Sequence, residues 1–276
     1  MRPCPVCDSS ESTAVAALEP FGFSKCVRCG AWSAGDLNDS TVNGSREPST
    51  QGPEHSLKAP TSSLKSNLRI WRQHLKLIEH HSTGRRLLDV RCGSGGFLSS
   101  AAASGFDAEG IDPRHAHVAA ATSGGLRATH GSIGATELGR RFDVITAWNA
   151  IGFEPNPVAV GRHLRSLLDD RGVLLIGTLD NASPVIRRLG HHWWRLRPPR
   201  RLFYYNQKAL TVLLSRSGFE LLGFERIRVR WVDSRTVLAA ASTLVGGAIG
   251  GRLAKLVQIE LPVYQGGLIV AVARPR

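Results

Sequence analysis

The stretch Arg85-Arg-Leu-Leu-Asp-Val-Arg-Cys-Gly-Ser-Gly-Gly-Phe-Leu98 decides the predicted fold. Within it, Leu87–Val90 predicts a short buried strand that includes Asp89. The glycines of Gly93–Gly96 predict a tight turn, and the Ala-rich run Phe97–Ala103 predicts a helix. Glycine suits such a turn because it tolerates unusual backbone angles and lets a ligand approach the bare backbone. Strand, glycine turn and helix in this order are typical of the opening of a nucleotide-binding βαβ unit.

An acidic residue follows this unit at a spacing that has a chemical meaning. Phe106–Asp112 predicts a second strand, and Asp112 lies 23 positions after Asp89. A carboxylate at the end of the second strand can accept hydrogen bonds from both hydroxyls of a ribose. A dinucleotide-binding dehydrogenase would carry Gly-x-Gly-x-x-Gly. The order Asp89, Gly93, Gly95 disfavours that alternative.

Together, the turn and the acid resemble class I S-adenosylmethionine (SAM) methyltransferases, whose motif runs Asp-x-Gly-x-Gly-x-Gly. The resemblance implies that SAM lies across the glycine turn, with its ribose on the acid of the second strand. It also implies that adenine lies near the turn after the third strand and that the transferred methyl group faces the end of the fourth. The implied cofactor-binding residues are Asp89, Arg91, Gly93, Gly95, Asp112, Ser132, Ile133, Trp148 and Asn149.

The rest of the chain alternates predicted strands and helices. After Ala108–Ile111, strands are predicted at Leu126–Ile133, Phe142–Trp148, Gly172–Thr178, Phe219–Arg228 and Gly267–Arg274, and helices at Leu64–His80, Val158–Leu168 and Ala209–Ser217. This alternation predicts an α/β fold, a Rossmann-like doubly wound sheet of seven strands as in class I methyltransferases. The last strand can pair antiparallel near the edge of the sheet.

Two Cys-x-x-Cys pairs precede this domain. Cys4 and Cys7 are separated by 18 residues from Cys26 and Cys29. Four thiolates at this spacing can converge on one Zn²⁺ in tetrahedral geometry, and a shell of four cysteines leaves no open position, so the predicted zinc is structural. The alternatives are unrelated reduced thiols or a redox pair.

The predicted organisation has three parts. Residues 1–35 form a small zinc ribbon, residues 36–63 form a flexible linker rich in Ser, Thr, Pro and Gly, and residues 64–276 form the methyltransferase-like domain. Trp71, on the helix that opens the domain, is expected to pack on the sheet, and by resemblance it also helps to close the cofactor pocket.

The segment Gly190–Tyr205 narrows the resemblance to the branch related to ubiquinone-biosynthesis O-methyltransferases, some members of which carry an amino-terminal zinc ribbon. Four departures from that branch affect the chemistry. Arg91 replaces the first turn glycine, Ser132 replaces an acid beside the adenine, Gly152-Phe153 replaces a Glu-His pair, and Arg200-Arg201 replaces a second one.

The loss of both family histidines removes the obvious general base, because a histidine with a pKa near 6.5 suits proton removal from a hydroxyl. Methyl transfer from a sulfonium still gains from positioning alone. His191, His192, Tyr204 and Tyr205 are the candidate catalytic substitutes, with packing and surface roles as the alternative for each.

Charge and hydropathy bear on partners. The formal net charge is +13, and the segment Arg187–Arg201 holds six arginines with two tryptophans. The alternative for the net charge is a solvated basic surface. The arginine-rich segment suits an anionic or aromatic acceptor or RNA, with a structural lid over the pocket as the alternative. Thr236–Gly251 carries no charge and is expected to be buried, with peripheral membrane contact as the alternative. No secretion signal is visible, so a cytoplasmic location is expected.

The sequence therefore predicts a SAM-dependent methyltransferase that acts on a small or amphipathic biosynthetic acceptor and contains structural Zn²⁺. Two alternatives remain. One is a catalytically degenerate scaffold or partner protein that keeps the fold, and the other is a zinc-ribbon RNA methyltransferase.

Overall fold

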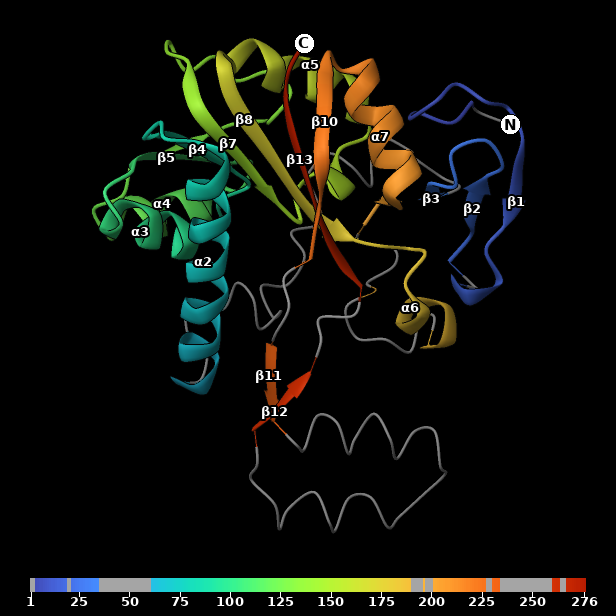
Figure 1. Ribbon diagram of the computed structural model, residues 1–276, viewed down its shortest axis with the longest axis horizontal. Helices are drawn as coiled ribbons and strands as arrows, with labels where there is room; N and C mark the ends of the chain where they lie inside the picture. Colours follow the sequence, from blue (N-terminus) through green and yellow to red (C-terminus); the bar gives the residue numbers. More distant parts are fainter. Residues whose placement is uncertain are drawn as a thin grey trace.

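The computed structural model of the chain describes residues 3–18, 21–34, 61–189, 196, 201–226, 230–233, 260–263 and 267–276. A seven-stranded sheet forms its centre, in the order β10-β13-β8-β7-β4-β5-β6 (Figure 1). Its strands are β4 (Arg86–Val90), β5 (Asp107–Asp112), β6 (Ala128–His130), β7 (Phe142–Trp148), β8 (Leu168–Leu179), β10 (Phe219–Glu225) and β13 (Leu268–Pro275). β4 to β8 run parallel, and β13 alone runs against them, because β13 pairs antiparallel with β8 and β10 pairs antiparallel with β13. The predicted α/β class and seven-stranded sheet are confirmed.

Helices cover both faces of the sheet (Figure 1). One face carries α2 (Thr61–His81), α3 (Gly96–Ala103) and α4 (His115–Ser123), and the other carries α5 (Pro157–Leu167) and α7 (Gln207–Arg216). Successive side chains of a strand point to opposite faces. Leu87 therefore joins the core under α2 and α3, and Leu88 joins the core under α5 and α7.

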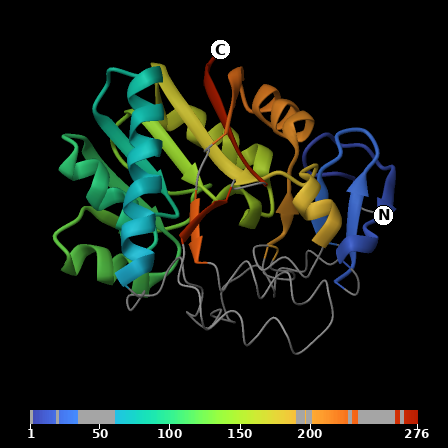
Figure 2. The same ribbon diagram turned by 60° about the horizontal axis from the view of Figure 1, so that its bottom comes forward.

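The amino-terminal ribbon consists of β1 (Ser12–Ala14), β2 (Phe23–Cys26) and β3 (Trp32–Ala34), with η1 (Ala16–Leu18) between the first two. Its sheet gains a fourth strand from a distant part of the chain, β9 (Phe203–Tyr204), because Trp32 of β3 pairs antiparallel with Tyr204. Ile186 of α6 (Pro184–Leu189) joins the core of the ribbon, and Figure 2 shows the ribbon alongside this helix. The ribbon is thus built onto the larger sheet domain.

Several boundaries differ from the predictions. α2 begins at Thr61, so residues 61–63 of the predicted linker belong to this helix. β8 begins at Leu168 rather than at the predicted Gly172, because Leu168 pairs with Phe142 at the start of β7. The remainder of the predicted linker, and Thr236–Gly251, lie outside the described residues. On either side of Thr236–Gly251 in the chain, β11 (Arg230–Asp233) and β12 (Glu260–Val263) pair antiparallel.

Among the helices that the structure describes, none is both long and apolar enough to cross a membrane.

Candidate cofactor site and cysteine cluster

The carboxyl edge of the parallel strands brings the predicted cofactor residues together. Asp89 of β4 pairs with Gly110 of β5 on one side and with Thr146 of β7 on the other. The turns that follow these strands therefore lie side by side, although the chain separates them widely. In open α/β sheets, ligands bind outside the carboxyl ends of the strands.

Asp112 ends β5 and is joined directly to the glycine turn. Its Oδ2 atom accepts a hydrogen bond from Gly93 N at 2.9 Å, and Oδ1 accepts from Arg114 N at 3.0 Å and Arg114 Nε at 3.2 Å. Burial raises the pKa of Asp112, but hydrogen bonds from His117 and Arg114 outweigh burial and hold this pKa below its usual range. The carboxylate is therefore ionised at neutral pH beside backbone that a ligand can approach.

Asp89 is the other buried acid of this edge. Its Oδ1 atom accepts a hydrogen bond from Thr146 Oγ1 at 2.7 Å. Burial raises the pKa of Asp89 to about 7. The hydrogen bond from Thr146 lowers this pKa, and the negative charge of Asp112 raises it. Asp89 and Asp112 thus differ in ionisation because their hydrogen-bond partners differ.

Arg91 is the first residue of the turn, and its backbone lies in the left-handed region with a φ of 56°. Its Nη1 atom lies 3.2 Å from Oε1 of Glu154, which follows the short helix η2 (Ile151–Phe153) after β7. The guanidinium also lies over the ring of Phe153, with its central carbon 4.7 Å from the ring centroid. Burial lowers the pKa of Arg91, and the carboxylates of Glu154 and Asp112 oppose that effect. Arg91 therefore bridges the turns after β4 and β7.

Asn149, the residue after β7, is also left-handed, with a φ of 55°. Its backbone N–H donates to Gly177 O at 2.7 Å, and its Oδ1 atom accepts from Nη2 of the buried Arg201 at 3.3 Å. Arg201 also lies over the Phe153 ring at 4.9 Å, on which Arg91 packs as well. Two of the three non-glycine residues with positive φ among those described, Arg91 and Asn149, thus lie at this edge.

The residues expected beside the adenine follow β6. Ser132 is exposed, and its Oγ atom accepts a hydrogen bond from Gly134 N at 3.4 Å. Ile133 is buried in the core under α5 and α7. The peptide N–H of Gly131 donates to Asp112 O at 3.1 Å, which attaches this turn to the end of β5.

An aromatic cluster under α2 was missed by sequence reasoning. The ring of His74 stacks on Trp148 with a centroid distance of 3.8 Å and an interplanar angle of 7°, and Phe97 lies edge-on to both. His74 Nδ1 and Trp148 Nε1 are buried without a hydrogen-bond partner among the described residues. Burial lowers the pKa of His74 to about 3, so this ring is neutral at pH 7. The sequence signal for this cluster was a histidine between Trp71 and Leu75 of α2. The apolar spacing of this helix predicts core packing.

Comparison with known families bears on this geometry. Residues 65–223 match the model of the family described as "Methyltransferase domain", a span that covers more than half of the chain. The chain belongs to this family.

Two curated relatives of this methyltransferase-family chain carry the name "Ubiquinone biosynthesis O-methyltransferase". The protein from Paraburkholderia phymatum is 31% identical over 116 residues, which cover 38% of the chain and 50% of the relative. The protein from Azorhizobium caulinodans is 29% identical over 173 residues, which cover 54% of the chain and 66% of the relative. The chain thus spans between half and two thirds of the length of these relatives.

Solved structures share the fold at low sequence identity. A SAM-dependent methyltransferase of Thermotoga maritima, titled a possible histamine N-methyltransferase, has a TM-score of 0.53 at 18% identity, covering 77% of this chain and 91% of that one. The PH0226 protein of Pyrococcus horikoshii has a TM-score of 0.56 at 15% identity, covering 82% and 97%. These likenesses support the fold of the methyltransferase-family chain.

The structure describes two of the four candidate catalytic residues, Tyr204 and Tyr205. His191 and His192 lie outside the described residues. Tyr204 and Tyr205 are fully buried; Tyr204 packs against Phe23 and Trp32 of the ribbon, and the hydroxyl of Tyr205 donates to Ile151 O at 3.3 Å. Packing explains both tyrosines, so we carry neither forward as a catalytic candidate.

The four ribbon cysteines converge. Their sulfur atoms all lie within 4.8 Å of one another, with 3.7 Å between Cys4 and Cys29 and 3.5 Å between Cys7 and Cys26. A tetrahedral zinc ion with Zn–S bonds of about 2.3 Å requires sulfur atoms about 3.8 Å apart. The geometry of this cluster therefore fits zinc.

Side chains of the sheet domain hold both cysteine turns. Gly30 O accepts hydrogen bonds from Asn181 Nδ2 at 3.0 Å and from Asn206 Nδ2 at 3.1 Å. On the other turn, Val6 O accepts from Arg216 Nη1 at 2.9 Å. These contacts, together with the β3–β9 pairing, tie the cysteine cluster to the segment that carries Arg201.

A cavity of about 420 Å³ lies elsewhere, at the amino edge of the sheet, where Glu79, His81, Gly84, Asp143 and Arg171 are among its lining residues. We assign the ligand site to the carboxyl edge instead, because parallel sheets bind ligands there and because the buried charges lie there.

Proposed function

We propose that the chain is a SAM-dependent methyltransferase that modifies a small or amphipathic acceptor. One observation carries this proposal. The Asp112 carboxylate at the end of β5 accepts a hydrogen bond from Gly93 N of the turn after β4, which supports a site where Asp112 binds the ribose beside the glycine turn. Membership of the methyltransferase family supports the same conclusion.

The residues at this edge suit SAM. An ionised carboxylate has about four acceptor positions, and three of those on Asp112 already hold hydrogen bonds from Gly93 and Arg114. His117 supplies a further hydrogen bond to this carboxylate, so a ribose diol would take the positions that Arg114 Nε and His117 now occupy. The adenine would lie over Ser132 and Ile133, and Asp89, Arg91, Gly95, Trp148 and Asn149 would surround the rest of the cofactor.

When bound, SAM supplies a methyl group on a positively charged sulfur. The chain's own residues contribute position and exclusion of water. The indole of Trp71 lies so close over Gly96 that a Cβ at this glycine would collide with it, and the His74–Trp148 stack closes the space beside it. Holding two reactants in line supplies much of the acceleration in such displacements. The names of the two curated relatives favour an oxygen nucleophile on the acceptor.

We further propose that Cys4, Cys7, Cys26 and Cys29 bind one structural Zn²⁺. Because four cysteines complete the tetrahedron, the ion has no position for a substrate. Elemental analysis is expected to find one zinc per chain, and Cys26→Ser is expected to lower both the zinc content and the melting temperature. Full zinc content in that variant would contradict the assignment.

Calorimetric titration with S-adenosylhomocysteine (SAH) tests the proposed activity. We expect binding by the purified chain and at least about tenfold weaker binding by Asp112→Ala, because a ribose hydrogen bond to a charged group contributes about 1.5–3 kcal/mol. Asp107→Ala is the matched control, since Asp107 begins the same strand at the opposite edge. Equal losses in both variants would contradict the assignment of Asp112.

A scaffold without cofactor is the second candidate, and the Arg91–Glu154 ion pair across the site is the observation that favours it. A scaffold predicts no binding heat with the wild-type chain and binding by Arg91→Gly. The RNA alternative loses one of its proposed contacts, because Arg201 is buried rather than on a surface that RNA could reach.

A further inference from the structure

The ion pair between Arg91 and Glu154 is the feature of the carboxyl edge that the proposed function leaves unexplained. The two side chains are only 20% and 11% exposed, and their charged atoms lie 3.2 Å apart. Burial raises the pKa of Glu154, and Arg91 opposes that rise. A buried ion pair gains little stability, because removing two charges from water costs about as much as their attraction returns.

The backbone of Arg91 adds to this cost. At a φ of 56°, the residue adopts a left-handed conformation that is strained for an L-residue with a Cβ. Phe153 packs under the guanidinium and holds it in place. An ion pair that is buried, strained and supported in this way indicates a functional role more than a stabilising one.

The position of the pair relative to Asp112 indicates which ligand it suits. Asp112 ends β5, Arg91 follows β4 and Glu154 follows β7, and these strands are neighbours in the order β7-β4-β5. Two strand spacings amount to about 10 Å. A ribose held at Asp112 and linked through its 5′ carbon to an amino-acid chain would place the amino-acid head at Arg91 and Glu154.

We propose, on the basis of the SAM-binding function above, that the Arg91–Glu154 pair opens to receive the zwitterionic amino-acid head of the cofactor. Arg91 takes the α-carboxylate and Glu154 takes the α-ammonium. One ion pair is thereby exchanged for two, so neither buried side chain is left with an unpaired charge. The planar guanidinium can donate in parallel to both carboxylate oxygens, which also orients the head.

Two ligands separate the head from the nucleoside. SAH carries the amino-acid head, whereas 5′-methylthioadenosine lacks it and keeps the ribose and adenine. Calorimetry measures both ligands with the wild type, with Arg91→Met, with Glu154→Gln and with the double variant, which leaves no unpaired charge in the site. The matched control is Arg86→Met/Asp143→Asn, because this ion pair joins the same two strands at the opposite edge.

We expect Arg91→Met and Glu154→Gln each to weaken SAH binding by about 10-fold to 100-fold, since a hydrogen bond to a charged group contributes about 1.5–3 kcal/mol. Binding of 5′-methylthioadenosine is expected to stay within about twofold in every variant, because it makes neither contact. In the double variant, SAH is expected to bind no more tightly than 5′-methylthioadenosine. The control variant keeps the wild-type preference for SAH.

Three results would overturn the inference. Tighter SAH binding by Arg91→Met would show that the side chain obstructs the site. An unchanged preference for SAH in all variants would remove the head-group role while leaving the cofactor site intact. Absence of binding by either ligand to the wild type and to the double variant would remove the proposed function, and the inference with it.

Discussion

Strands β4 and β7 are joined by an ion pair at each end, and the two pairs differ in environment. At the amino edge, Arg86 pairs with Asp143, and their side chains are 43% and 22% exposed. At the carboxyl edge, Arg91 and Glu154 are 20% and 11% exposed. Hydrogen bonds from Arg86 lower the pKa of Asp143, whereas burial raises the pKa of Glu154. The environment of the carboxyl group thus favours its ionisation at the amino edge and opposes its ionisation at the carboxyl edge.

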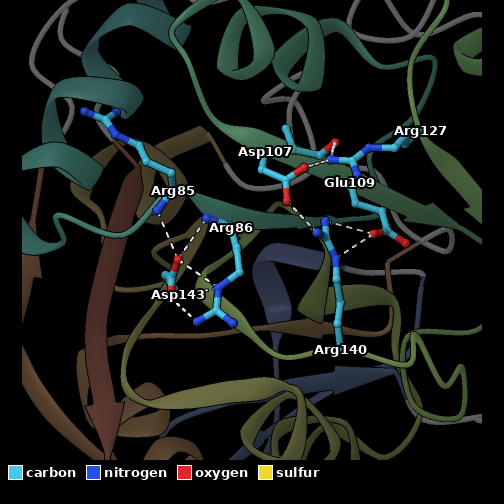
Figure 3. A network of polar contacts seen from close by, with 8 residues as sticks. Arg85, Arg86, Asp107, Glu109, Arg127, Arg140 and Asp143 are labelled. Atoms are coloured by element: carbon cyan, nitrogen blue, oxygen red, sulfur yellow. Dashed lines mark hydrogen bonds and ion pairs between the residues drawn. The ribbon is translucent and has the colours of Figure 1, made fainter.

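The amino edge gathers several such ion pairs, and each is more exposed than the pair at the carboxyl edge. Figure 3 shows that Asp107 contacts both Arg127 and Arg140, that Arg140 also contacts Glu109, and that Asp143 accepts from Arg85 and Arg86. Hydrated ion pairs need little support from the fold, whereas buried charges persist only where surrounding structure or function maintains them. The contrast supports the proposal that the ligand site lies at the carboxyl edge.

The largest expected effect comes from breaking the buried pair. Arg91→Met leaves Glu154 as an unpaired buried charge, and we expect it to lower the free energy of unfolding by about 3–5 kcal/mol at pH 8. Urea denaturation measures this loss. Arg91→Met/Glu154→Leu is expected to regain most of it, and a loss below about 1 kcal/mol in the single variant would show that water reaches the pair.

Asp89 gives the next effect, through pH. Its pKa of about 7 in the folded chain exceeds the ordinary 3.8, so the stability that it contributes is full below about pH 3.8 and is lost as pH rises through 7. Between pH 5 and 7, the wild type should lose about 2–3 kcal/mol relative to Asp89→Asn, at no more than 1.36 kcal/mol per pH unit. Parallel stability curves for the two proteins would contradict this expectation.

His74 is expected to act with the opposite sign. Its pKa of about 3 lies below the ordinary 6.5, so its stability is present above pH 6.5 and is lost as pH falls toward 3. From pH 6.5 to 5, the wild type should lose about 2 kcal/mol that His74→Phe retains, at 1.36 kcal/mol per pH unit. Chemical denaturation of both proteins over that range checks the difference, and equal losses would indicate that His74 is hydrated.

The smallest effect is expected at the amino edge. Arg127→Met removes an ion pair with Asp107 whose side chains are 55% and 43% exposed, and Arg140 remains to hold this carboxylate. We expect a loss of no more than about 1 kcal/mol, which 0.5 M salt reduces further by screening. Thermal unfolding at low and high salt measures it. A loss as large as that of Arg91→Met would end the distinction between the edges.

Much of the fold was predictable because its determinants are local. The glycine turn after Leu87–Val90, the acid at Asp112 and the apolar run of β8 each specify an element and its place in the alternation. The cofactor residues are those that the resemblance to class I methyltransferases implies, and parallel pairing brings the turns after β4, β5 and β7 to one edge.

The features that were missed depend on contacts between distant segments. Glu154 follows no motif and gains its meaning from Arg91 across the site. Arg201 stands where the related branch has a Glu-His pair, but its contact with Asn149 could not be predicted from that position. Likewise, the pairing of Trp32 with Tyr204 joins two segments far apart in the chain. Local sequence patterns do not reveal this pairing, so they predict a separate ribbon.

By itself, the sequence determined the sheet, the glycine turn with its acid, and the four-cysteine pattern, because short-range spacing and hydrophobic alternation specify them. Only the tertiary structure decided which buried charges face one another. Burial and partner geometry set the protonation of Asp89, the pairing of Arg91 with Glu154 and the neutrality of His74, and none of these quantities exists until the turns after β4, β5 and β7 are packed together.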